Sequence, residues 1–152
     1  MNEDEREEIL TWIDENLSSF IPLPNNRLWC DISTANVPAC VWKIKQRLLE
    51  LEGLHSRMQT ETPDFIVVIL PGGFIHKHID GNLGEFIHYR YNFFIETPLE
   101  GGEIYYDDKC VDARECEYVI LKAGLHEHWS RPVVKGRLTM MSFGFYIPLI
   151  SS

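Results

Sequence analysis

The pattern of apolar residues changes near residue 60, and this change limits the folds open to the chain. Before residue 60, apolar side chains recur at the spacing of amphipathic helices. After it, short apolar or alternating segments are separated by glycine-containing turn sequences, as in an antiparallel sheet. Helices followed by many short strands predict an α+β fold whose β part is a sandwich or jelly roll.

Two helices are predicted in the first 60 residues. Asn2 can cap the first helix, whose opening turn is rich in acidic residues. The second helix is expected to have Pro38 in its first turn and to stop at Gly53. The residues expected in the core are Ile9, Leu10, Trp12, Ile13, Leu17, Trp29, Val41, Trp42, Ile44, Leu48 and Leu51.

The clearest strand is the apolar run from Phe65 to Leu70, which is followed by Pro71-Gly72-Gly73. This run is far too short to cross a membrane as a helix. Other segments with strand-like patterns lie between turn sequences. They span residues 74–79, 88–96, 103–106, 117–121 and 137–147.

The length and net charge of the chain indicate how many domains it forms and which partners are unfavourable. A chain of 152 residues fits one domain, and its net charge of -9 argues against nucleic acid as a partner. The acidic first residues are unlike a secretion signal, and the four cysteines form no C-x-x-C pair. We therefore expect a cytoplasmic protein with reduced thiols and no membrane partner.

A first group of candidate ligands is the sequence His76-Lys77-His78-Ile79-Asp80. On a strand, alternate side chains share a face, so His78 and Asp80 would point the same way. An imidazole and a carboxylate placed in this manner can occupy neighbouring positions on one metal ion. A single His-x-Asp is common by chance, so this motif is weak alone.

A second group lies in the segment from His126 to Thr139. His128 offers a third ligand, and two histidines with one carboxylate leave open coordination positions, as in non-haem iron(II) oxygenases. Arg137 opens an apolar strand, where its charge needs a partner that a bound dicarboxylate would supply. Thr139 shares the face of Arg137 and could add a hydrogen bond.

Taken in order, these motifs resemble the 2-oxoglutarate/iron(II)-dependent dioxygenase superfamily. The segment from His128 through Pro132 to Phe143 is similar to prolyl-hydroxylase-like members. The stretch 90–101 resembles the aspartyl/asparaginyl β-hydroxylases, although Asp80 departs from that family, which lacks the acidic ligand. The resemblance covers residues 64–148.

The resemblance implies a double-stranded β-helix (a jelly roll, cupin-like) over residues 64–148, with residues 1–60 as mainly helical support within one domain, 1–152. It implies Fe(II) on His78, Asp80 and His128, with 2-oxoglutarate and O2 as cosubstrates. The 5-carboxylate of 2-oxoglutarate would pair with Arg137 and Thr139. The expected reaction is hydroxylation of a peptide side chain or small molecule, coupled to decarboxylation of 2-oxoglutarate to succinate.

Several alternatives remain open from the sequence. His126 has the same strand parity as His128, but the spacing to Pro132 favours His128. His76 shares the face of His78, so it is expected to line the pocket, to support the metal site or to be exposed to solvent. Arg90 and Asn92 contact the cosubstrate or substrate if they face the barrel, and face solvent otherwise. A non-catalytic jelly-roll domain that retains a metal, or a cupin isomerase, would also explain the pattern, and the oligomeric state is left open.

Overall fold

The computed structural model describes residues 1–58 and 60–148, and the two predicted helices are present. Helix α1 spans Glu3–Asn16 and begins with a capping box, in which the Asn2 side chain accepts a hydrogen bond from the backbone N–H of Glu5. Helix α2 spans Ala39–Leu51, and Gly53 follows it in the left-handed conformation, with φ of 61°. Short 3-10 helices follow α1 and α2 at Leu17–Ser19 and Leu54–Ser56.

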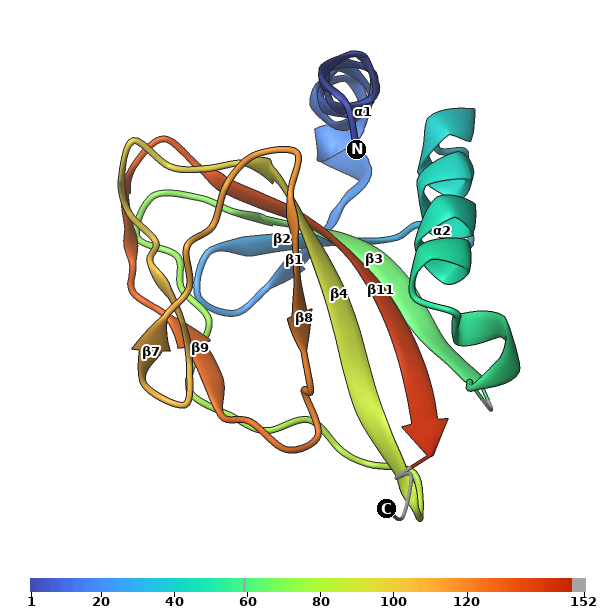
Figure 1. Cartoon of the computed structure of the whole chain (residues 1–152). Helices are drawn as coiled ribbons and strands as arrows, with labels where there is room; N and C mark the ends of the chain where they lie inside the picture. The colour runs from blue at the N-terminus through green and yellow to red at the C-terminus, as the bar shows by residue number, and fades with distance from the viewer. Residues whose placement is uncertain (59, 149–152) are drawn as a thin grey trace.

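A six-stranded antiparallel sheet forms the main wall of the molecule, in the order β1-β2-β3-β11-β4-β8. The long strands β3, β11 and β4 lie at its centre (Figure 1). Its strands are β1 (Ile21–Leu23), β2 (Arg27–Asp31), β3 (Thr60–Ile69), β4 (Phe86–Glu96), β8 (Tyr118–Leu121) and β11 (Leu138–Pro148).

Smaller strands lie on one side of this sheet and the helices on the other (Figure 1). A three-stranded sheet has the order β7-β6-β9, and β10 pairs with β5. These strands are β5 (Glu100–Gly101), β6 (Ile104–Tyr106), β7 (Lys109–Cys110), β9 (His128–Ser130) and β10 (Val133–Lys135).

The two faces of β4 and β11 have different neighbours, and this decides which side chains reach the site. Odd-numbered residues such as Phe93 and Phe143 pack in the core beneath the helices. Even-numbered residues such as Phe94 and Met140 pack in a second core, toward the smaller sheets. Since side chains alternate along a strand, only the even-numbered positions can line a cavity between the sheets.

Part of the strand prediction is wrong. Residues 74–79 form no regular strand. Ile75 pairs with Ser130 and His78 pairs with His128, so two residues on one side lie opposite a single residue on the other. This extra residue interrupts the ladder of hydrogen bonds. The strands β1 and β2 were not predicted. Leu51 and Trp42, expected inside, are 74% and 40% exposed. Within the described residues, no helix has the length and apolar character needed to span a membrane.

Candidate metal centre

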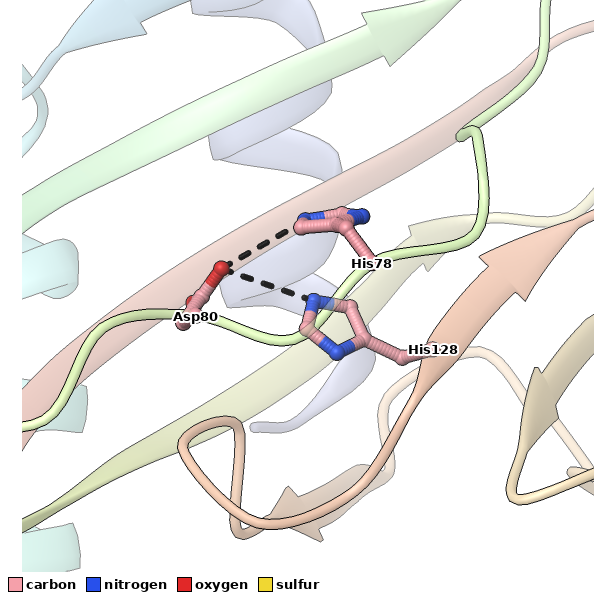
Figure 2. A group of neighbouring side chains, drawn as sticks. All are labelled: His78, Asp80 and His128. Atoms are coloured by element: carbon pink, nitrogen blue, oxygen red, sulfur yellow. Dashed lines mark ion pairs between the residues drawn. The ribbon is translucent and has the colours of Figure 1, made fainter.

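The three predicted metal ligands converge in space. The candidate ligand atoms of His78, Asp80 and His128 all lie within 4.8 Å of one another. One carboxylate oxygen, Oδ1 of Asp80, lies 3.4 Å from Nε2 of His78 and 3.7 Å from Nε2 of His128 (Figure 2). Two imidazoles and one carboxylate oxygen therefore face a common point.

Backbone hydrogen bonds hold the three ligands together although residues 74–79 are irregular. The backbone N–H groups of His78 and His128 each donate to the other residue's carbonyl, at 3.2 and 2.9 Å. The N–H of Asp80 donates to the carbonyl of Ala123 at 2.8 Å. An isolated bridge thus replaces the regular strand that was predicted.

The hydrogen bonds of the two histidine rings select the tautomer that metal binding requires. Nδ1 of His78 lies 2.7 Å from the carbonyl of His76, and Nδ1 of His128 lies 3.1 Å from the carbonyl of His126. A carbonyl oxygen only accepts, so each Nδ1 carries the proton. The lone pair of each Nε2 is then directed to the centre, an arrangement typical of histidines that bind metals.

The second oxygen of Asp80 is held by a residue that the sequence did not suggest. Nδ1 of His88 lies 3.3 Å from Oδ2 of Asp80, and His88 is only 6% exposed. Burial and the nearby charge of Arg90 lower the pKa of His88 to about 4, so its ring is neutral. A neutral ring with its proton on Nδ1 places that N–H beside Oδ2, while Oδ1 faces the two other histidines.

The charges of the three ligands are coupled. The Asp80 carboxylate, which can accept a hydrogen bond from the protonated ring, raises the pKa of His78. Burial lowers the pKa of His128, which favours its neutral form. Burial alone would raise the pKa of Asp80, but its hydrogen bond with His78 and the nearby His128 and His88 outweigh burial and lower it. Asp80 is thus an anion beside two imidazoles, which suits a divalent cation.

Replacing His88 should weaken metal binding without removing a ligand. We expect His88→Phe to lower the affinity for Co(II) about tenfold, because partners that orient metal ligands typically contribute 10- to 100-fold. Competition with a chromophoric chelator measures this affinity. His76→Phe is a matched control, since His76 is exposed and supports His78 through its backbone carbonyl. Equal affinities for the two variants would contradict the role of His88.

A cavity of about 290 Å³ opens beside the three ligands. Its polar lining includes Ser142, whose buried Oγ has no hydrogen-bond partner among the described residues. Next to Ser142 on the neighbouring strand, Asn92 donates to the hydroxyl oxygen of Tyr106 at 3.1 Å. Burial raises the pKa of Tyr106 to about 12, so its hydroxyl remains a donor. Apart from two arginines, the other walls of the cavity are apolar and aromatic: Leu23, Trp29, Phe65, Val67, Ile75, Leu121 and Met140.

Arg90 lines this cavity. The sequence left open whether Arg90 faces the barrel or solvent, and in the structure it faces the barrel. Its guanidinium lies over the ring of Phe65, 4.7 Å from the centroid, and donates to the carbonyl of Pro63 at 2.8 Å. No carboxylate within the described residues forms an ion pair with it. Gly144, opposite Arg90 on β11, makes room for it, because a Cβ atom there would lie 2.5 Å from Nη1 of Arg90.

Arg137 and Thr139, predicted to bind the cosubstrate, do not line this cavity. Thr139 lies on the odd-numbered face of β11 and Arg137 directly precedes this strand. Arg137 pairs with Glu96 and, at 2.8 Å, with Asp14 of helix α1. The hydroxyl of Thr139, which is fully buried, donates to the same Glu96 carboxylate at 3.3 Å. Arg137 and Thr139 do contact the same carboxylate, but this carboxylate is the side chain of Glu96.

The structure also shows where the two other candidate histidines, His126 and His76, lie. His126 forms an ion pair with Asp107 rather than joining the three ligands. His76 is exposed, and its ring stacks on His78 with 4.8 Å between centroids. His128 is therefore the histidine from the distal segment that reaches Asp80.

The cavity contains functional candidates that the sequence analysis missed. Arg27 and Trp29 line it from β2, a strand that was not predicted, and Trp29 had been assigned to the core. Arg27 and Trp29 are two residues apart, and this spacing could have indicated a strand with both side chains on one face. The segment lies between prolines and a helix and is too short for its secondary structure to be predicted from the pattern. His88 and Tyr106 lie in predicted strands, where nothing in the sequence showed which face is inward.

Comparison with solved structures shows the fold. The collagen prolyl hydroxylase of Paramecium Bursaria Chlorella virus-1, in its 2-oxoglutarate complex, matches with a TM-score of 0.72 at 13% identity, over 93% of this chain and 91% of that one. A Pseudomonas putida prolyl-4-hydroxylase matches with a TM-score of 0.73 at 14% identity, over 98% and 89%. Streptomyces hygroscopicus HygX, with nickel, 2-oxoglutarate and hygromycin B bound, gives 0.69 at 12%, over 99% and 80%.

These matches confirm the predicted α+β, double-stranded β-helix fold with N-terminal helices. No family model and no curated protein matches the sequence. Fold and site together define the class: a double-stranded β-helix protein whose His-x-Asp and distal histidine converge beside a cavity.

Proposed function

We propose that this protein is an iron(II)- and 2-oxoglutarate-dependent oxygenase that hydroxylates a peptide side chain or a small molecule. The observation that carries the proposal is the convergence of His78, Asp80 and His128 at the edge of a cavity. This cavity also contains Arg90, which has no carboxylate partner in the part of the chain that the structure describes. A metal on one side and a free guanidinium on the other fit a chelating dicarboxylate.

The ligand set supports iron(II) as the metal. Two neutral imidazoles and one carboxylate leave half of an octahedral coordination sphere for other ligands, the pattern of non-haem iron(II) oxygenases. A structural zinc site is instead closed by four protein ligands. Among the proteins of similar fold, HygX was solved with nickel and 2-oxoglutarate, which is consistent with a divalent metal and the same cosubstrate here.

In this proposal, Arg90 takes the role first predicted for Arg137. Its fork of N–H donors would bind the distal carboxylate of 2-oxoglutarate. Ser142 pairs with Asn92, two positions along from the Gly144 and Arg90 pair and therefore on the same face. Its buried hydroxyl, which has no partner among the described residues, would donate to the same carboxylate. Burial lowers the pKa of Arg90, but a guanidinium stays charged at neutral pH.

Bound iron and 2-oxoglutarate would supply the oxidising chemistry, in which 2-oxoglutarate is decarboxylated to succinate and one oxygen atom of O2 enters a C–H bond. The residues of this chain bind, orient and shield. His88 fixes the orientation of Asp80, and the backbone carbonyls of His76 and His126 fix the histidine rings. The apolar walls around Phe65 and Met140 limit the access of water.

Anaerobic titration tests the proposal. Adding Fe(II) and then 2-oxoglutarate should give the visible charge-transfer band of the chelate, and admitting O2 should give succinate. A protein that binds metal but gives neither band nor succinate would instead be a non-catalytic jelly-roll domain that retains a metal.

Substitution of Arg90 and of Arg137 should show which of the two arginines binds 2-oxoglutarate. We expect Arg90→Met to weaken 2-oxoglutarate binding by about 2 kcal/mol, roughly thirty-fold, because it leaves a carboxylate without its charged partner. Calorimetry with the Mn(II)-loaded protein measures the binding. Arg137→Met is the matched control: it should keep the affinity and lower the free energy of unfolding by about 1 kcal/mol, through loss of the contacts to Glu96 and Asp14. The reverse result would restore the first assignment.

A further inference from the structure

The cavity contains a second arginine that 2-oxoglutarate does not require. Arg27 lies on β2, and β3 and β11 separate this strand from β4, which carries Arg90. Nε of Arg27 donates to the carbonyl of Pro24 at 2.9 Å. Among the described residues, no carboxylate lies within ion-pair distance of its guanidinium. Arg27 and His78 line the same cavity, so the charge of Arg27 faces the candidate metal centre.

The charges at the proposed site are balanced without Arg27. With the histidines neutral, the two positive charges of a ferrous ion and the charge of Arg90 equal the negative charges of Asp80 and 2-oxoglutarate. The charge of Arg27 is then left without a partner in a partly buried cavity. A buried or half-buried charge is stabilised by an opposite charge, so the loaded site favours one further anion.

The wall beside Arg27 is apolar and aromatic. Trp29 is two residues along the same strand and therefore on the same face. Its ring lies 6.3 Å from that of Phe65, between centroids, and Leu23 and Val67 complete this part of the lining. A ligand held here would combine an anionic group with an apolar body.

We propose that the primary substrate carries a carboxylate that binds Arg27, next to an apolar segment that packs on Trp29 and Phe65. This inference rests on the proposed oxygenase function and adds the substrate class. The carboxylate belongs to a small organic acid or to the C-terminus of a peptide, because both present the same planar pair of oxygens to a guanidinium.

Matched acids and amides test the inference. The probes are 3-phenylpropionate and 3-phenylpropionamide for a small acid, and N-acetylphenylalanine and its amide for a peptide terminus. Binding to the anaerobic protein loaded with Fe(II) and 2-oxoglutarate is measured by calorimetry and by the change in the chelate band. We expect at least one acid to bind about tenfold or more tightly than its amide, the range for a charged hydrogen bond. The favoured pair identifies the source of the carboxylate.

Variants assign the preference to Arg27. Arg27→Met should remove the preference for the acid, and Arg27→Lys should restore part of it. Arg57→Met, at an exposed arginine, is the control and should keep it. The inference is overturned if acid and amide bind equally, if neither acid binds, or if Arg27→Met weakens 2-oxoglutarate instead. Absence of the chelate band in the unmodified protein would contradict the proposed function itself, so the two failures are distinguishable.

Discussion

The variant His128→Ala should lose at least about a hundredfold in affinity for Fe(II) or Co(II), because even residues that only orient metal ligands contribute 10- to 100-fold. Asp80→Ala should have an effect of similar size. Each substitution removes one of the ligand atoms that lie within 4.8 Å of one another. The chelate band and succinate formation should disappear in both variants. Metal affinity is measured by chelator competition, and circular dichroism checks the fold.

His126→Ala is the matched control, because His126 is two residues away and pairs with Asp107 outside the centre. This variant should bind metal and form the chelate band like the unmodified protein. If His126→Ala lost the metal and His128→Ala kept it, the distal ligand would be the other histidine. Loss of metal in neither variant would contradict the proposed centre.

A second large effect is expected away from the site, at the buried ion pair between helix α2 and β3. Nζ of Lys45 lies 2.7 Å from Asp64 and 2.5 Å from Glu61, and it faces the ring of Phe145 at 5.6 Å. Asp64 is only 4% exposed. Lys45→Met leaves this carboxylate buried without its cation, so the free energy of unfolding should fall by about 3–5 kcal/mol. Urea denaturation measures the loss.

Lys43→Met, at an exposed position on the same helix, should change stability by less than about 0.5 kcal/mol. The effect at Lys45 should also depend on pH. Burial raises the pKa of Asp64 even beside Lys45, and removing the ammonium raises it further. A carboxyl with a higher pKa in the folded state binds its proton more tightly when folded, so acidification through that pKa should reduce the loss in Lys45→Met. A loss that grows with acidification would contradict this assignment.

The convergence of the three candidate metal ligands could be predicted from the sequence, although the local structure around them could not. Strand alternation correctly placed His78 and Asp80 near each other, but residues 74–79 form an irregular segment joined to β9 by an isolated bridge. The prediction succeeded because residues two apart point the same way in most extended conformations. The extra residue between Ile75 and His78 becomes visible only once its pairing with Ser130 and His128 is known.

The arginine that lines the cavity could not be selected from the sequence, because both faces of the central strands are apolar. On β11, Met140 faces the smaller sheets while Met141 and Phe143 face the helices. A strand buried on both sides has no polar face to mark its orientation. The sequence analysis favoured Arg137 for a bound carboxylate and left the orientation of Arg90 open. In the folded chain Arg137 pairs with Glu96 and with Asp14 of α1.

The sequence by itself determined the α+β class, the positions of the helices and the three candidate metal ligands, since these follow from short-range periodicity and from the chemistry of side chains. The tertiary structure decided which face of each strand lines the cavity, and so brought Arg90, Arg27 and His88 to the site. The physical reason is that face selection depends on which surfaces the helices cover, and this is a sum of long-range contacts that no local pattern records.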